Sequence, residues 1–152
     1  MVRTSVMNLT LGIMKIKDPR LSKYFSAFPF TLYILHFCHS LNYQWRELNS
    51  IIVDPKLTKH RLKMEISDQN DSMFYLCDLY QNGSNNVKNN MKNIFFLNCV
   101  LPVLIHQILK EEITPKLCLY LIHSILKVFK EKDICEFIAV LLFGKRLHSE
   151  IL

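Results

Sequence analysis

The sequence contains very little glycine, with 3 glycines in 152 residues. All-β folds and phosphate-binding α/β folds use glycine in turns and loops, whereas helices need little of it. No glycine-rich phosphate loop occurs, and neither H-E-x-x-H nor G-x-S-x-G is present. The sequence therefore favours an all-α fold and carries no motif of these enzyme classes.

Paired cysteines are also lacking. The chain has 5 cysteines, an odd number, and none of them forms a C-x-x-C motif. Each lies inside an apolar run; they are Cys38, Cys77, Cys99, Cys118 and Cys135. This pattern indicates buried free thiols in a reducing compartment rather than a disulfide framework. A thiol in apolar surroundings has a raised pKa and is inert, so we expect no catalytic cysteine.

A short cluster of metal-ligating residue types is the sequence H-F-C-H, which contains His36, Cys38 and His39. A structural zinc site normally needs four ligands, and no second pair follows at zinc-finger spacing. Neighbours at positions i, i+2 and i+3 also diverge around a helix. We therefore interpret these three as core and boundary residues, and we expect no metal, no cofactor and no enzymatic activity.

No apolar run is long enough for a clear membrane span. The longest, residues 94–109, has 16 residues and includes Asn98 and Pro102, whereas a spanning helix needs about 20 mostly apolar residues. The runs at 117–129 and 134–143 are shorter. Buried helices of a soluble protein are the preferred interpretation, and a small integral membrane protein that uses these three runs is the alternative.

The formal net charge is +6, with lysines spread along the chain and no Arg/Gly or Arg/Ser tract. We read most of these charges as solvated helix faces, and we expect neither a nucleic-acid partner nor a small-molecule substrate. A denser basic stretch contains Lys56, Lys59, Arg61 and Lys63. Each such residue close to an anionic membrane is worth about 1 kcal/mol, so this stretch is a candidate for weak contact with acidic lipid headgroups.

Helices account for most of the chain. In residues 1–17 the apolar positions recur at steps of 4, 3, 4 and 3, which predicts one apolar helix stripe; they are Val2, Val6, Leu9, Ile13 and Ile16. Asp18-Pro19 ends that helix. The aromatic stretch 21–52 predicts a short and a longer helix, separated at Pro29.

The second half contains two polar interruptions. Residues 53–71 are basic and poor in apolar side chains, which predicts a linker, and the asparagine-rich residues 82–93 predict an irregular loop. After the apolar run at 94–109, Thr114-Pro115 resembles a helix start. Asp133 with Glu136 resembles a capping box for a last helix that ends at Gly144.

These patterns predict one helical scaffold segment over residues 1–152, all-α, with about six helices. No strict sequence period is visible, so a consensus tetratricopeptide or ankyrin array is absent. Degenerate armadillo-like or HEAT-like helix pairs are compatible with the sequence, because those folds need only stacked apolar faces. We therefore expect a fragment of an α-solenoid.

Several apolar motifs resemble, in their order and rough spacing, the endosomal-maturation-defective (Ema) family. Its vertebrate member is named C-type lectin domain family 16 member A, and its plant members are transparent-testa proteins. The motifs are M-V-R-T-S-V-M-N-L-T-L-G-I-M-K-I at 1–16, F-Y-L-C-D-L-Y-Q-N-G at 74–83, F-L-N-C-V-L-P-V-L-I at 96–105, L-C-L-Y-L-I-H-S-I-L-K-V-F at 117–129 and I-A-V-L-L-F-G at 138–144.

This resemblance implies a helical, armadillo-like scaffold that acts in endosomal and Golgi membrane traffic and in autophagy. It implies protein partners from that machinery and a cytoplasmic location peripheral to endosome or Golgi membranes. The ubiquitin-ligase activity attributed to the vertebrate branch has no zinc-ligand array to support it in this sequence.

Proteins of that family are much longer than this chain. The resemblance therefore implies a middle segment, a truncated gene model or a reduced paralogue that lacks the family's N-terminal domain. We therefore expect an exposed apolar stripe near Val2 and Val6 that a longer protein would cover. A chain with such a stripe should be poorly soluble or should self-associate.

Overall fold

The computed structural model describes residues 2–16, 18–54, 56, 59–103 and 113–143, and within these ranges it contains helices and no strand. The all-α prediction is confirmed, with seven α-helices and one π-helical segment in the described residues rather than about six helices. The elements are α1 (Val2–Lys15), α2 (Pro19–Phe25), α3 (Phe28–Val53), α4 (Lys59–Asn82), α5 (Asn85–Phe95), η1 (Phe96–Val100), α7 (Pro115–Val128) and α8 (Lys132–Phe143).

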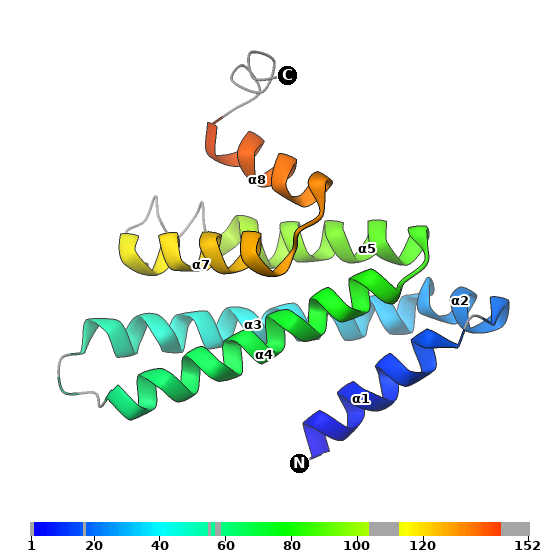
Figure 1. Cartoon of the computed structure of the whole chain (residues 1–152), viewed down its shortest axis with the longest axis horizontal. Helices are drawn as coiled ribbons and strands as arrows, with labels where there is room; N and C mark the ends of the chain where they lie inside the picture. Colours follow the sequence, from blue (N-terminus) through cyan, green and yellow to red (C-terminus); the bar gives the residue numbers. More distant parts are fainter. Residues whose placement is uncertain (1, 17, 55, 57–58, 104–112, 144–152) are drawn as a thin grey trace.

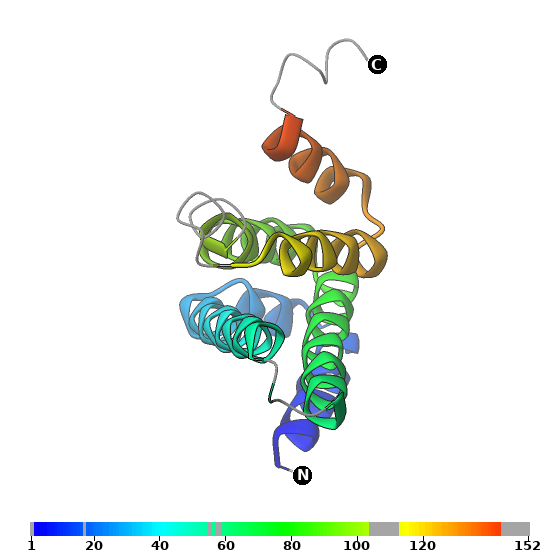
Figure 2. The same ribbon diagram turned by 90° about the vertical axis from the view of Figure 1, so that its left-hand side faces the viewer.

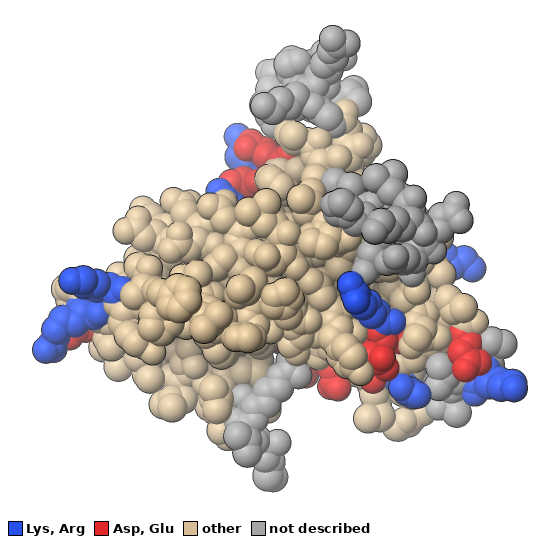
Figure 3. Space-filling model, turned by 180° about the vertical axis from the view of Figure 1, so that it is seen from behind, with Lys and Arg blue, Asp and Glu red and all other residues tan. Residues whose placement is uncertain are grey.

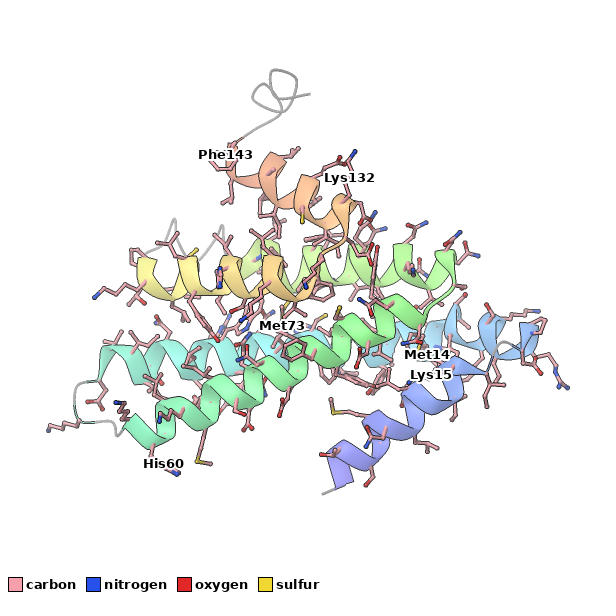
Figure 4. All side chains as sticks on the ribbon, in the orientation of Figure 1. Met14, Lys15, His60, Met73, Lys132 and Phe143 are labelled. Carbon is pink, nitrogen blue, oxygen red and sulfur yellow. The ribbon has the colours of Figure 1, made fainter. Side chains whose placement is uncertain are left out.

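The long helices form two layers (Figure 1). Helices α3 and α4 run in opposite directions in one layer, and α5 with η1 and α7 lie side by side in the next, as Figure 2 also shows. The layers are held by one continuous core, in which Trp45, Met73 and Leu121 are fully buried. Met73, labelled in Figure 4, lies at the middle of α4. Helix α1 and helix α8 lie at opposite ends of the molecule (Figure 1).

Local signals start and end several helices as predicted. The Asp18 carboxylate accepts a hydrogen bond from the backbone N–H of Arg20 at 2.7 Å and so caps α2. Pro29 stands in the first turn of α3, where its missing N–H costs nothing, and the chain bends just before it at residues 26–27. Thr114 is the N-cap residue of α7, although its side chain makes no capping bond, and Gly83 directly follows the end of α4.

The predicted polar linker at 53–71 is wrong over most of its length, because α4 begins at Lys59. Leu62, Ile66, Gln69 and Met73 follow at steps of 4, 3 and 4 and form the inward face of this helix. Lys63, Asp68 and Asp71 between them are exposed, and Lys63 and Glu65 are good helix formers. A buried glutamine in the stripe hides this periodicity from a count of apolar residues.

The predicted irregular loop at 82–93 is also wrong, because α5 begins at Asn85. Val87, Met91 and Phe95 recur every fourth residue and are buried, while the asparagines between them are exposed. The low helix propensity of asparagine is overcome here by burial of that apolar stripe. The interruption between α4 and α5 is only residues 83–84.

Helix α5 widens into the π-helical segment η1 where a proline follows. Pro102 has no N–H to donate to the carbonyl of Asn98, four residues earlier, and its ring clashes with that carbonyl in a regular helix. The Asn98 carbonyl instead accepts a hydrogen bond from Asn42 Nδ2 of α3 at 2.6 Å. The proline thus frees an acceptor that joins the two layers.

No helix in the described ranges is both long and apolar enough to cross a lipid bilayer. The runs at 117–129 and 134–143 coincide with α7 and α8, which have 14 and 12 residues. Residues 104–109 of the third run lie outside the described residues, as does the predicted helix end at Gly144.

We expect replacement of the two described glycines by alanine to change the stability of the fold in opposite directions. A Cβ on Gly83 would lie 2.8 Å from Val87 Cγ1, and Val87 is buried, so Gly83→Ala should cost about 1–3 kcal/mol. A Cβ on Gly12, inside α1, meets nothing within 4 Å, so Gly12→Ala should stabilise the fold by about 0.5–1 kcal/mol. Urea unfolding of both variants checks this, and shifts of the same sign would contradict it.

Candidate functional site

The four predicted membrane-contacting cations lie at the α3–α4 turn and on the first turns of α4. Lys59 and Lys63 are one helical turn apart and share a side of α4, and Lys56 precedes them in the turn. Arg61 is turned toward α3, where its guanidinium lies 3.5 Å from the Glu47 carboxylate. The structure therefore brings three of the four cations to one end of the molecule and directs the fourth to an ion pair.

The H-F-C-H sequence does not converge on a common point. Cys38 is buried in the core, whereas His36 and His39 are exposed on α3. Among the described residues, no three His, Cys, Asp or Glu side chains are placed so that they could hold a metal ion. This arrangement fits the interpretation of these residues as core and boundary positions.

The cysteine thiols lie in apolar surroundings. Burial raises the pKa of the Cys77, Cys99 and Cys118 thiols above their ordinary value, most strongly at Cys99, whose side chain is fully buried. Its Sγ lies 3.8 Å from the carbonyl oxygen of Cys38. The thiolate form that nucleophilic chemistry requires is therefore disfavoured at these positions.

Asp133 has a different role from the predicted capping box. The first backbone bonds of α8 go to the carbonyl of Glu131, so Asp133 lies in the first turn. Its carboxylate accepts a hydrogen bond from Lys92 Nζ at 2.8 Å and one from the Tyr80 hydroxyl at 3.2 Å. These bonds tie α8 to α4 and α5, and burial together with Asp133 raises the pKa of Tyr80 to about 12.

The Asp133 interactions predict a pH-dependent contribution to stability. The hydrogen bond from Lys92 lowers the pKa of Asp133 below its ordinary value of 3.8. The stabilisation is therefore complete above that ordinary value and is lost as the pH falls through the lower, folded-state pKa. Because the pair is partly exposed, Asp133→Asn should cost only roughly 0.5–1 kcal/mol at neutral pH. Urea unfolding at neutral and acidic pH checks this, and an undiminished difference in acid would contradict it.

A groove opens where the first three helices meet. It has a volume of about 500 Å³ and no charged residue in its lining. Helices α1 and α2 and the start of α3 form its walls. The lining residues are Val6, Thr10, Ile13, Leu21, Tyr24, Phe25, Pro29, Phe30 and Tyr33. Phe25 and Phe30 of this lining are buried and pack edge to face with ring centroids 4.8 Å apart.

Two of the hydroxyl groups in the groove lining, those of Thr10 and Tyr33, are hydrogen-bonded within the protein. The hydroxyls of Tyr33 and Tyr75 lie 2.7 Å apart and join α3 to α4, and the Thr10 hydroxyl donates to the Val6 carbonyl at 2.9 Å. Burial and the Tyr33 hydrogen bond raise the pKa of Tyr75 well above its ordinary value. The groove lining is therefore mainly apolar, with the Thr10 and Tyr33 hydroxyls already engaged.

Apolar side chains continue outward from the groove onto the surface. Leu9 of α1 is 64% exposed and Phe28 at the start of α3 is 74% exposed, while Val6 and Tyr24 on the groove wall are about half exposed. The expected exposure of the α1 stripe is confirmed at Val6, and the side chain of Val2 lies outside the described ones. The expected self-association stays a prediction.

The opposite end of the molecule also exposes apolar side chains. Helix α7 exposes Leu119 and Leu126, and α8 exposes Leu142 and Phe143, the latter labelled in Figure 4 at the end of α8. Only Ile134 and Ile138 of α8 are buried among the described residues. Exposed apolar residues also lie elsewhere, such as Tyr43 of α3, Met64 of α4 and Leu97 of η1. A group of them on one helix is typical of surfaces that other proteins cover.

The sequence predicts the apolar stripe of α1 but not the groove beside it. The groove needs three helices to converge, and its walls come from positions 6 to 33 of the chain. The feature of the sequence that relates to this groove is the cluster of aromatic residues around Pro29.

One curated protein similar to this chain is Protein TRANSPARENT TESTA 9 of Arabidopsis thaliana, which is 23% identical over 153 residues. The match covers 94% of this chain but only 18% of the length of that protein. No family model matches the chain, and no solved structure matches it. The match supports the plant, transparent-testa part of the resemblance; the Ema and vertebrate parts stay predictions.

Proposed function

We propose that this chain is a non-enzymatic helical scaffold segment that acts in membrane traffic through protein–protein contacts. The observation that carries the proposal is the pair of apolar surfaces at the two ends of the helical body, around α1–α3 and around α7–α8. Covering such a surface with a partner stabilises the complex by about 25 cal/mol per Å² of apolar area that is buried. The described side chains offer packing rather than a cluster of reactive groups.

The more detailed form of the proposal follows the family resemblance. We infer a cytoplasmic location peripheral to endosome or Golgi membranes, partners from the trafficking and autophagy machinery, and an armadillo-like stacking of helix pairs. The similarity to the transparent-testa protein and the two layers of paired helices support this inference. The basic turn with Lys56, Lys59 and Lys63 is suited to weak contact with anionic headgroups.

Cargo transport in cells tests the proposal. The gene is deleted in cells that express the protein, and an endocytosed fluorescent tracer is followed to the degradative compartment. We expect slower delivery, restored by re-expression of the wild-type protein. As a control, Tyr43→Ala on the exposed side of α3 should restore delivery equally well. Normal delivery in the deleted cells would contradict a role in this transport.

A further inference from the structure

We propose that the outer face of α4 binds a helix of a partner protein, one that presents Lys or Arg side chains around apolar residues. The proposed function, a chain that works through protein–protein contacts, underlies this inference, and the α4 face adds a surface to the two apolar ends. The residues that carry it form one stripe, which we call the α4 outer stripe: Met64, Ser67, Asp71, Phe74 and Asp78.

The α4 outer stripe lies opposite the buried side of its helix. Its members follow one another at steps of 3, 4, 3 and 4 residues, so they share one face. All five are exposed, whereas Gln69, Met73 and Leu76 on the other side are buried. Helix α4 crosses the front of the body in Figure 1, and Figure 2 shows no described helix that covers its outer side. At 1.5 Å per residue, the stripe is open over about 21 Å.

The carboxylates on this side of α4 are not neutralised within the protein. Asp71 and Asp78 form no ion pair with another described residue, and neither does Asp68, which is also exposed. No Lys or Arg occurs from Met64 to Val87, a segment with four acidic residues, although the whole chain has a net charge of +6. The α4 outer stripe is therefore locally negative, and complementary charges on a partner are those of Lys and Arg.

The carboxylates do not belong to a general pattern of the surface. Figure 3, which views the molecule from behind, shows a broad surface without charged side chains. In Figure 4, the labelled His60 at the start of α4 points away from the rest of the body, one helical turn before Met64 of the stripe. The negative stripe is thus one outward side of a single helix.

Two apolar side chains on the stripe favour a protein over other cationic ligands. Phe74 is 54% exposed and Met64 is 55% exposed, and only apolar groups of a partner would remove them from water. A metal ion would leave both in water, and no three His, Cys, Asp or Glu side chains of the described residues could hold one. Nucleic acids and anionic membranes carry the wrong sign of charge for this stripe.

The spacing of the stripe favours a helix as the bound element. Alternating steps of 3 and 4 residues are the pattern by which two helices pack along each other. A partner helix of about four turns spans the stripe. Its apolar residues would cover Phe74 and Met64, and its cations would reach the carboxylates between and beside them.

The test uses the full chain and labelled synthetic helices of about 20 residues, long enough to span the stripe. The probe peptide has a Leu stripe flanked by Lys; one control has Glu in place of each Lys, and another has Ser in place of each Leu. Fluorescence anisotropy gives the Kd of each. We expect the Leu/Lys peptide to bind at least about tenfold more tightly than either control at low salt, with a smaller advantage over the Glu peptide at high salt. The net charge of the chain, +6, favours the Glu peptide, so the opposite preference identifies a local site.

Matched charge variants of the chain locate the site. Asp71→Asn with Asp78→Asn removes two exposed carboxylates with little change of shape, and it should weaken binding of the Leu/Lys peptide by about tenfold or more. Asp54→Asn with Glu136→Gln makes the same change of charge at the end of α3 and on α8, and it should leave the Kd close to that of the wild type. Circular dichroism verifies that each variant is folded.

A second pair of variants tests the apolar contact. Phe74→Ala should weaken binding of the Leu/Lys peptide at low and at high salt, because apolar contact is not screened. Leu119→Ala, at an exposed apolar residue of α7, should leave the Kd unchanged.

Three results would overturn the proposal. Equal or tighter binding of the Glu peptide would remove the charge selection, and wild-type binding by Asp71→Asn with Asp78→Asn would place the site elsewhere. The third is self-association through the stripe. If the wild type sediments as an oligomer and the Asn variant as a monomer in analytical ultracentrifugation, the occupant is a second copy of this chain. None of these results bears on cargo delivery, which tests the proposed function separately.

Discussion

Replacement of Trp45 by alanine is expected to lower the free energy of unfolding by about 3–5 kcal/mol. Trp45 lies in α3 with no exposed surface, between the two helix layers. Its indole N–H has no hydrogen-bond partner among the described residues, so the loss comes from packing and from the cavity left behind. Domains of this size are stable by about 5–15 kcal/mol, so the variant should be close to unfolding at ordinary temperature.

Urea unfolding followed by far-ultraviolet circular dichroism measures this change. Tyr43→Ala, two residues earlier in the same helix, is the matched control, because Tyr43 is 64% exposed. That variant should stay within about 0.5 kcal/mol of the wild type. Similar losses at Trp45 and Tyr43 would show that α3 does not face the core as described.

Phe96→Ala is expected to have the second large effect, about 3–5 kcal/mol, and to release α8 from the body. Phe96 is 2% exposed in the π-helical segment, and its ring stacks on Phe137 of α8 with centroids 4.0 Å apart. The other anchors of α8 are the buried Ile134 and Ile138 and the bonds that Asp133 accepts from Lys92 and Tyr80. Without the Phe96 ring, α8 should lose much of its attachment.

Hydrogen exchange resolved by peptide checks this expectation. In Phe96→Ala, the amides of α8 should exchange much faster, beyond any change in α3 and α4. Leu97→Ala is the control at the next position, because Leu97 is 61% exposed and should leave α8 protected. Unchanged protection of α8 in Phe96→Ala would mean that the ring stack does not hold this helix.

Much of the fold follows from local patterns in the sequence. The stripe of α1, the cap at Asp18 and the proline at the start of α7 each depend on neighbouring residues. They could be predicted because helix periodicity and capping are short-range effects. The all-α class follows from the same patterns.

The sequence-based predictions are wrong where burial of side chains outweighs the local preference for a loop or a helix. Gln69 has no exposed surface, and its Oε1 accepts a hydrogen bond from the Tyr120 hydroxyl of α7 at 3.0 Å, a contact 51 residues away in the chain. A buried, hydrogen-bonded polar residue interrupts the apolar stripe in the sequence. The pattern therefore predicts a linker where the first turns of α4 lie. The asparagines of α5 likewise predict a loop, but burial of Val87, Met91 and Phe95 makes the segment helical.

The candidate site could be predicted only in part. The exposed stripe of α1 is visible in the sequence, but the groove depends on the angle at which α1, α2 and α3 meet. Asp133 looked like a capping residue because its partners, Lys92 and Tyr80, are more than 40 residues away in the chain. Such long-range pairs are set by the packing of whole helices, which no local pattern specifies.

Proximity labelling in intact cells tests most directly the central claim that this chain is a scaffold whose end surfaces hold trafficking proteins. A biotin ligase is fused to the wild-type chain and to Val6→Glu, with Tyr43→Ala as the control for an exposed position away from the groove. The account predicts that wild type and Tyr43→Ala label the same membrane-traffic proteins, and that Val6→Glu loses a defined subset of them. A labelled set without trafficking proteins, or one that Val6→Glu leaves unchanged, would contradict it.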